Sequence, residues 1–184
     1  MNTTIYQNIA TRTAGDIYIG VVGPVRTGKS TFIKRFMETQ VIPSIENVYR
    51  KERARDELPQ SGSGRTIMTT EPKFVPDEAV SISPGGNTTF NVRLIDCVGY
   101  VIKNAKGLED ENGPRMVKTP WFEAEIPFTK AAHIGTKKVM TDHATIGVIV
   151  TGDGSFGEIE RTDFYPVEKE LVLEMKALHK PFIV

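Results

Sequence analysis

The chain has 184 residues, 39% of them hydrophobic, which suits one domain with a substantial core. Basic and acidic residues balance at 23 each, so no overall charge attracts nucleic acid or an anionic membrane, and no segment approaches the roughly twenty apolar residues of a transmembrane helix. A single cysteine, Cys97, excludes an internal disulfide and a zinc site of several cysteines, and it fits a cytoplasmic setting.

The first third of the chain predicts a strand, a loop and a helix. The run Ile17–Val22 is apolar and rich in β-branched residues, and Gly23 ends it, which is typical of a buried strand. Residues 30–39 place Ile33, Phe36 and Met37 at the spacing of one helix face. Residues 40–70 are polar and charged, and we expect a partly helical connection there.

The middle of the chain predicts a hairpin followed by a long loop. Residues 73–82 and 89–95 read as strands, separated by a segment dense in turn residues. Residues 100–128 are rich in Gly, Pro, Asn and charge, and they lack clear periodicity. We therefore expect a long loop without regular structure, of the kind that is usually functional or disordered.

The last third predicts a helix over 129–143, a strand over 145–151, a helix over 166–180 and a strand from 181. Pro166 suits a first helical position, and the apolar residues Val167, Leu171, Met175 and Leu178 share one helix face. Alternating strands and helices predict an α/β fold with a doubly wound, mostly parallel sheet and a possible antiparallel edge hairpin. Because the last strand would lack a covering helix, we expect residues 1–184 to be one domain from the N-terminal part of a longer protein.

A phosphate-binding motif joins the first strand to the first helix. Residues 23–30 read Gly-Pro-Val-Arg-Thr-Gly-Lys-Ser and match the pattern of a P-loop, or Walker A motif. In such a loop, backbone N–H groups surround a polyphosphate, Lys29 contacts the β- and γ-phosphates, and Ser30 ligates Mg²⁺. The alternative is a chance glycine turn. The expected nucleotide-contacting residues are Gly23, Pro24, Val25, Arg26, Thr27, Gly28, Lys29, Ser30 and Thr31.

A second motif follows the strand that ends at residue 95. Asp96 opens an Asp-x-x-Gly sequence that Gly99 closes. A carboxylate there can hold hydrated Mg²⁺, and the Gly99 N–H can meet the γ-phosphate, although an ordinary Asp at a strand end is the alternative. Tyr100 stands where many GTPases carry a glutamine that orients the attacking water, so the water must be positioned otherwise.

Two adjacent threonines precede the strand at 73–82. Thr69 and Thr70 are candidates for closing over the metal and the γ-phosphate, with Thr70 as the candidate metal ligand. The alternative is that both are β-formers entering a strand. Lys29, Thr69, Thr70 and Asp96 are therefore the candidate catalytic residues.

With these residues placed, nearly the whole chain resembles the stage IV sporulation protein A family of spore coat ATPases. The stretches that carry the resemblance are residues 15–33, 56–60, 66–76, 96–100 and 109–116. The resemblance implies a fold related to translation-factor-type GTPases, with ATP and Mg²⁺ as cofactors. It also implies that ATP hydrolysis drives self-assembly of the spore coat basement layer around the forespore. By position, Lys29 is similar to the Walker A lysine, Asp96 to the Walker B-type aspartate, and Thr69 with Thr70 to the paired threonines needed for hydrolysis.

The family resemblance also implies partners and a location. The expected partners are further copies of the protein, a small amphipathic membrane-anchoring peptide and other coat morphogenetic proteins, largely through regions outside this segment, and no nucleic acid. The expected location is the cytoplasm on the mother cell side of the forespore surface, peripheral to the outer forespore membrane. The main alternative is a small GTPase-like switch that recruits a partner without polymerising. A static nucleotide-stabilised scaffold is a third hypothesis, which the retained site residues disfavour.

Overall fold

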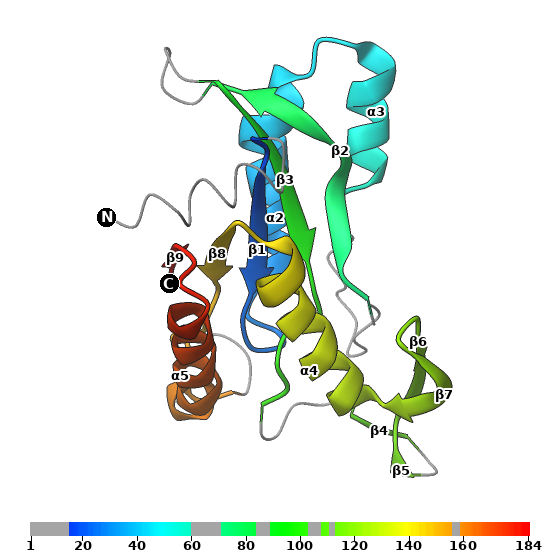
Figure 1. Cartoon of the computed structure of the whole chain (residues 1–184), viewed down its shortest axis with the longest axis vertical. Helices are drawn as coiled ribbons and strands as arrows, with labels where there is room; N and C mark the ends of the chain where they lie inside the picture. Colours follow the sequence, from blue (N-terminus) through cyan, green and yellow to red (C-terminus); the bar gives the residue numbers. More distant parts are fainter. Residues whose placement is uncertain (1–14, 60–70, 84–88, 103–107, 111–112, 156–158) are drawn as a thin grey trace.

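A five-stranded sheet forms the centre of the protein, as seen in a computed structural model that describes residues 15–59, 71–83, 89–102, 108–110, 113–155 and 159–184 (Figure 1). The strand order is β2-β3-β1-β8-β9. Neighbouring strands are parallel, except that β2 pairs with β3 in antiparallel fashion at one edge. The mixed α/β fold and the mostly parallel sheet are thus as predicted. The strands are β1 (Ile17–Val22), β2 (Lys73–Ile82), β3 (Phe90–Asp96), β8 (Ile146–Ile149) and β9 (Phe182–Ile183).

Helices cover both faces of this sheet. Adjacent residues of β1 contribute to different clusters of buried side chains: Val21 packs with Ile33 of α2 (Lys29–Phe36), and Val22 packs on the face that contains α4 (Phe128–Lys138) and α5 (Arg161–Ala177). Figure 1 shows α2 behind the sheet and α4 in front of it. Because successive side chains of a strand point to opposite faces, a strand buried on both sides reads as the continuous apolar run seen in the sequence.

The chain remains helical beyond the end of α2. After α2 the chain continues as a π-helical turn, η1 (Met37–Val41), and a short 3-10 turn, η2 (Ile42–Ser44). Helix α3 (Val48–Asp56) follows, and the Asn47 side chain caps it by accepting a hydrogen bond from the Arg50 N–H (3.0 Å). The predicted helix over 30–39 and the partly helical connection are both confirmed within the described residues.

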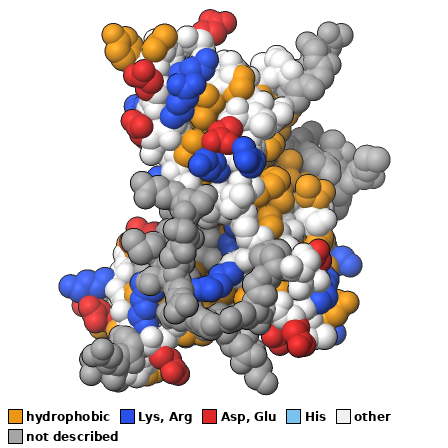
Figure 2. All heavy atoms as spheres, turned by 180° about the vertical axis from the view of Figure 1, so that it is seen from behind, with side chains coloured by type: hydrophobic (Ala, Val, Ile, Leu, Met, Phe, Trp, Pro, Cys, Tyr) orange, Lys and Arg blue, Asp and Glu red, His pale blue; other side chains and the backbone are white. Residues whose placement is uncertain are grey.

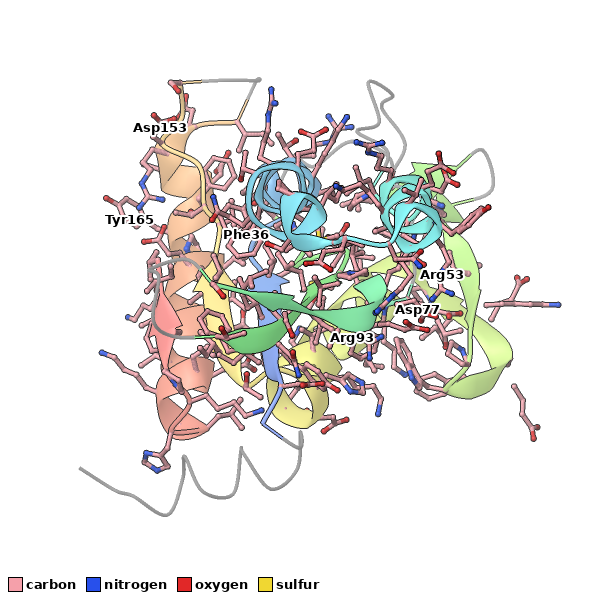
Figure 3. All side chains as sticks on the ribbon, turned by 90° about the horizontal axis from the view of Figure 1, so that it is seen from above. Phe36, Arg53, Asp77, Arg93, Asp153 and Tyr165 are labelled. Carbon is pink, nitrogen blue, oxygen red and sulfur yellow. The ribbon has the colours of Figure 1, made fainter. Side chains whose placement is uncertain are left out.

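Surface charges attach α3 to the edge strand β2. Arg53 of α3 lies 3.6 Å from Asp77 and 3.4 Å from Glu78, and Arg93 of β3 approaches Asp77 from the other side (3.8 Å). Figure 3 shows Arg53, Asp77 and Arg93 gathered at this edge. Arg50 adds a further pair with Glu78 (3.1 Å). Exposed pairs of this kind are individually weak, so the network positions α3 more than it stabilises the fold.

The helix before the last strand begins earlier than predicted. Helix α5 starts at Arg161, so Pro166 lies inside the helix and the prediction that it occupies the first position was wrong. Arg161 pairs through both terminal nitrogens with Glu168 (2.6 and 3.1 Å) and holds the added first turn. Pro166 is the sixth residue of α5, beyond the first four N–H groups that have no partner within a helix, so its missing N–H removes one helical hydrogen bond. The predicted apolar face is confirmed, with Val167, Leu171 and Met175 buried.

Residues 100–128 contain regular structure, contrary to prediction. Two small hairpins form, one from β4 (Glu109–Asp110) and β5 (Gly113–Pro114), the other from β6 (Met116–Thr119) and β7 (Phe122–Pro127). Residues 122–126 alternate apolar and polar side chains, but only Ile126 is buried, and residues 122–125 are all exposed. The rings of Trp121 and Phe122 lie near the Lys138 and Lys130 ammonium groups of α4.

Helix α4 continues as a π-helical turn, η3 (Val139–His143), which matches the predicted helix over 129–143. None of the helices in the described ranges is both long and apolar enough to cross a bilayer. Basic and acidic side chains are interspersed on the face in Figure 2.

Packing of α5 gives a test of the fold. Leu171 has no exposed surface, whereas Leu173 on the same helix is 55% exposed. We expect Leu171→Ala to lower the free energy of unfolding by about 2–5 kcal/mol, because it removes buried methyl groups and leaves a cavity. Leu173→Ala should change it by less than about 1 kcal/mol. Guanidinium denaturation of both variants measures the difference, and equal losses would contradict the described orientation of α5.

Candidate functional site

The loop of residues 23–30 lies at the carboxyl end of β1 and leads directly into α2. Gly23 has a φ of 151°, and a Cβ added there would lie 2.0 Å from the Val150 carbonyl oxygen, just after β8. Only glycine fits this approach. Gly28, in a left-handed conformation (φ 88°), forms the N-cap of α2 without a side-chain cap. The first N–H groups of α2 therefore lie beside the loop without partners inside the helix, an arrangement that favours binding of an anion.

Lys29 turns inward beneath this loop. Its side chain is buried, and its Nζ donates a hydrogen bond to the Pro24 carbonyl oxygen (2.6 Å). The Thr27 hydroxyl donates to the same oxygen (2.9 Å). Burial lowers the pKa of Lys29, while nearby Cys97 and Asp96 act in the opposite direction. The loop is thus closed around an amine whose charge is costly unless an anion accompanies it.

Asp96 ends β3 next to the loop. The Ser30 hydroxyl at the start of α2 donates to Asp96 Oδ2 (2.8 Å), although the two residues are 66 positions apart. Burial raises the pKa of Asp96, and the Ser30 hydrogen bond and the Lys29 charge oppose that rise. The second oxygen, Oδ1, is buried and has no hydrogen-bond partner within the described part of the chain. A buried acceptor of this kind beside a hydroxyl suits a hard cation with oxygen ligands.

The turn after Asp96 packs directly on the 23–30 loop. The Tyr100 N–H donates to the Gly23 carbonyl oxygen (3.1 Å), and the Val25 N–H donates to the Tyr100 carbonyl oxygen (2.9 Å). Gly99 has a φ of 91°, and a Cβ there would lie 2.2 Å from the Gly23 oxygen and 2.5 Å from Lys29 Nζ. The two predicted motifs therefore form one contiguous structure, with Gly99 against the Lys29 amine.

The side chain of Tyr100 serves the core. It is buried, its ring stacks on His133 (centroids 4.5 Å apart), and its hydroxyl donates to Glu174 Oε2 on α5 (2.6 Å). Burial is the main cause that raises the pKa of Tyr100 far above its ordinary value, and the Glu174 carboxylate adds to the rise. The residue at the usual glutamine position thus links the turn to α5.

The remaining predicted residues fall into three groups. Pro24 and Val25 are buried parts of the loop, and Arg26 and Thr31 are exposed beside it, Arg26 with a positive φ of 65°. Thr69 and Thr70 lie outside the described residues, so their placement stays a prediction. No cluster of three or more His, Cys, Asp or Glu side chains that could hold a metal occurs in the ranges that the structure describes.

Sequence reasoning missed Thr136 of α4, which meets the turn at Gly99. The Gly99 N–H donates to Thr136 Oγ1 (3.2 Å), and that hydroxyl in turn donates to Cys97 Sγ (3.7 Å). Nothing in the local sequence marks Thr136, because it lies on a helix 37 residues beyond Gly99. Cys97 itself is buried.

Residues 151–155 form a turn after β8. Asp153 Oδ1 accepts hydrogen bonds from the Ser155 N–H (2.8 Å) and hydroxyl (2.6 Å), which lowers its pKa. Arg161 and Glu168 of α5 hold Thr151 at the base of this turn. Figure 3 shows Asp153 and Tyr165 on this side of the molecule.

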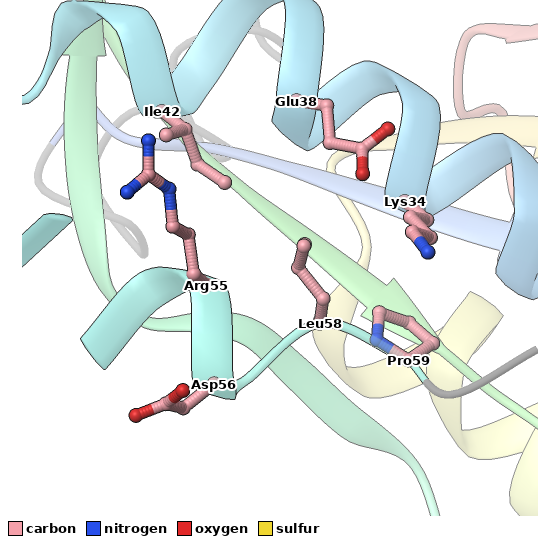
Figure 4. Close-up of a pocket in the computed structure, with 7 residues that line it drawn as sticks. All are labelled: Lys34, Glu38, Ile42, Arg55, Asp56, Leu58 and Pro59. Carbon is pink, nitrogen blue, oxygen red and sulfur yellow. The ribbon is translucent and has the colours of Figure 1, made fainter. Parts of the chain in front are cut away.

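An open groove of about 660 Å³ lies elsewhere, between α2 and α3 (Figure 4). None of its lining residues in the described ranges belongs to the 23–30 loop or the Asp96–Gly99 turn. The lining residues are Lys34, Glu38, Ile42, Arg55, Asp56, Leu58 and Pro59.

Comparison with known proteins gives a consistent result. The family model for the stage IV sporulation protein A ATPase domain matches residues 1–184. The chain is 62% identical to stage IV sporulation protein A of Bacillus anthracis and 58% identical to that of Bacillus subtilis (strain 168), each over 180 residues. It is 55% identical over 184 residues to the protein of the same name from Clostridioides difficile (strain 630).

These matches cover 98–100% of the chain and 37–38% of each relative, so the chain spans little more than a third of their length. No solved structure matches it significantly. The matched family model is that of an ATPase domain. The chain belongs to the stage IV sporulation protein A family.

Proposed function

We propose that residues 1–184 are a P-loop ATPase domain that binds ATP with Mg²⁺ and hydrolyses it. The hydrogen bond between Ser30 and Asp96 at the end of the 23–30 loop carries this proposal. It brings a hydroxyl and a carboxylate from two separate motifs to the position where P-loop proteins hold their metal. The family match supports ATP as the nucleotide.

The residues present fit Mg²⁺. Ser30 Oγ and Asp96 would hold the ion directly or through water, and the buried, unpartnered Asp96 Oδ1 would gain a partner. When bound, the ion neutralises charge on the phosphate oxygens. Lys29 would exchange the Pro24 carbonyl for a phosphate oxygen, which supplies the anion that a buried ammonium group favours.

Other residues would complete the site. N–H groups of the loop and of the first turn of α2 would surround the phosphates. Thr69 and Thr70, by family resemblance, would close over the metal and position the attacking water, since the Tyr100 side chain is bonded to Glu174 instead. Arg26 is exposed on the loop, where it could reach a phosphate.

For the longer protein, we propose that ATP hydrolysis drives self-assembly of the spore coat basement layer on the cytoplasmic, mother cell side of the forespore. A membrane-anchoring peptide and other coat proteins are the proposed partners. The resemblance to the family supports this proposal. A GTPase-like switch is the competing hypothesis, and nucleotide preference separates the two.

Phosphate release tests the hydrolysis. We expect the purified chain to release phosphate from ATP rather than GTP in the presence of Mg²⁺, and Lys29→Met and Thr70→Ala each to lower turnover at least about 100-fold, because each removes a group that stabilises the transition state. Lys34→Met, on the same helix as Lys29, is the matched control and should keep wild-type turnover. Preferential GTP hydrolysis would instead support the switch hypothesis.

The metal requirement tests Asp96. Asp96→Asn keeps the size of the side chain but removes its charge, so the Mg²⁺ concentration for half-maximal nucleotide binding should rise at least about tenfold. A magnesium titration with a fluorescent ATP analogue measures it. Asp77→Asn, on the exposed side of β2, serves as the control. An unchanged magnesium requirement in Asp96→Asn would remove this residue from the metal site.

A chimaera tests assembly. This chain would replace the matching 180 residues of the Bacillus subtilis relative, and sedimentation would be measured with ATP, ADP or GTP alongside the unmodified relative. We expect ATP to move the chimaera into the pellet and Lys29→Met to abolish this effect. Sedimentation that is the same with every nucleotide would contradict assembly driven by ATP hydrolysis.

A further inference from the structure

Thr136 lies where helix α4 meets the turn after Asp96. Its side chain has no exposed surface, and its hydroxyl oxygen accepts a hydrogen bond from the Gly99 N–H (3.2 Å). The hydroxyl proton is directed to Cys97 Sγ (3.7 Å). A buried threonine hydroxyl with both an acceptor and a donor role is fixed in orientation.

Gly99 is held from two sides. The adjacent Tyr100 N–H fastens the turn to the 23–30 loop through the Gly23 carbonyl, and Thr136 fastens it to α4. There is no room for a side chain at Gly99, since a Cβ would lie 2.5 Å from Lys29 Nζ. The Cα of Gly99 therefore lies close to the Lys29 amine that would contact the terminal phosphates, and its N–H points to Thr136.

A single N–H makes one strong hydrogen bond, so a terminal phosphate oxygen and Thr136 Oγ1 must compete for it. We propose that Thr136 is a positioning residue that sets how strongly the site distinguishes a nucleoside triphosphate from a diphosphate. A γ-phosphate takes the Gly99 N–H away from Thr136, whereas a diphosphate leaves the bond between them intact. This inference rests on the proposed nucleotide site.

The groups around Thr136 lower the cost of this exchange of hydrogen bonds. When the hydrogen bond from the Gly99 N–H to Thr136 breaks, the Thr136 hydroxyl keeps its hydrogen bond to Cys97 Sγ and is not left without a partner. The released turn stays attached to the loop through Tyr100. Next to Thr136, Lys137 lies 3.8 Å from Glu174 of α5, the carboxylate that also accepts the Tyr100 hydroxyl. The exchange therefore occurs at a junction of the turn, α4 and α5.

Valine in place of threonine tests the competition, because it keeps the shape and removes the acceptor. Affinities of wild type and Thr136→Val for Mg²⁺ with ADP and with a non-hydrolysable ATP analogue would be measured by calorimetry. We expect Thr136→Val to increase the preference for the triphosphate about three- to tenfold, the equivalent of one hydrogen bond, with little change for ADP. Thr136→Ser retains the hydroxyl and should keep the wild-type ratio.

Thr145→Val is the matched control. The Thr145 hydroxyl likewise accepts from a backbone N–H, that of Tyr18 (2.9 Å), but at the opposite end of β1 from the loop. The Thr145→Val substitution should destabilise the fold without changing the ratio of the affinities for ADP and for the ATP analogue. An equal change for both nucleotides in Thr136→Val, or none, would overturn the role of Thr136 while leaving the nucleotide site intact. Wild type that binds neither nucleotide would overturn both proposals.

A measurement on the wild type does not depend on folding of the valine variant. Val-Gly pairs occur only at 22–23 and 98–99, so labelling valine carbonyl carbon and glycine nitrogen isolates two amide resonances in a carbonyl-filtered NMR spectrum. Val98→Ile removes one of them and identifies Gly99. The ATP analogue should shift the Gly99 resonance far more than ADP does. Equal shifts with the two nucleotides would contradict the exchange.

Discussion

The parallel pairing of β1 with β3 is the constraint on which the rest of the structure depends. In this register Val21 lies opposite Asp96, so the loop that follows β1 and the turn that follows β3 emerge at the same edge of the sheet. Each motif is unremarkable alone, since one is a glycine turn and the other an acidic residue at a strand end. Their juxtaposition places Ser30 against Asp96 and Gly99 against Lys29, which brings the proposed cation-binding pair and the proposed phosphate-binding loop into one site.

This arrangement has an electrostatic cost. Lys29 and Asp96 are both buried. Burial lowers the pKa of Lys29 and raises the pKa of Asp96, and each shift favours the neutral form of the side chain. The fold tolerates the cost because two separate clusters of buried apolar side chains, one on each face of the sheet, hold β1 and β3 rigidly. Charged groups that have lost their hydration in this way interact strongly with a ligand of complementary charge. Such groups are common in functional sites.

Much of the fold and part of the site could be predicted from the sequence, for reasons that differ by residue. The loop at 23–30, Asp96 and Gly99 are contiguous motifs whose geometry is set locally by glycines and by the strand that precedes them. Thr136 and Glu174 could not be found in this way, because they reach the site only through packing of α4 and α5. The hairpins β4–β5 and β6–β7 were missed because their strands are only two to six residues long and lie in a segment rich in turn residues, where the short alternation over 122–126 does not stand out. Helix α5 begins earlier than predicted because the Arg161–Glu168 pair holds a first turn that Pro166 made unexpected. Thr69 and Thr70 lie outside the described residues and stay a prediction.

The charged edge of the sheet bears on how copies of the domain meet one another. Lys73, Asp77 and Glu78 are exposed on β2, and α3 is attached to this strand by the arginine pairs. Charged side chains on an edge strand oppose the addition of a strand from another chain, the commonest route to irregular aggregation of β-sheets. Crowded copies of the domain are thus discouraged from fusing their sheets at β2. An ordered contact between copies at this edge would have to be made by side chains rather than by pairing of strand backbones, so single substitutions on β2 could alter it.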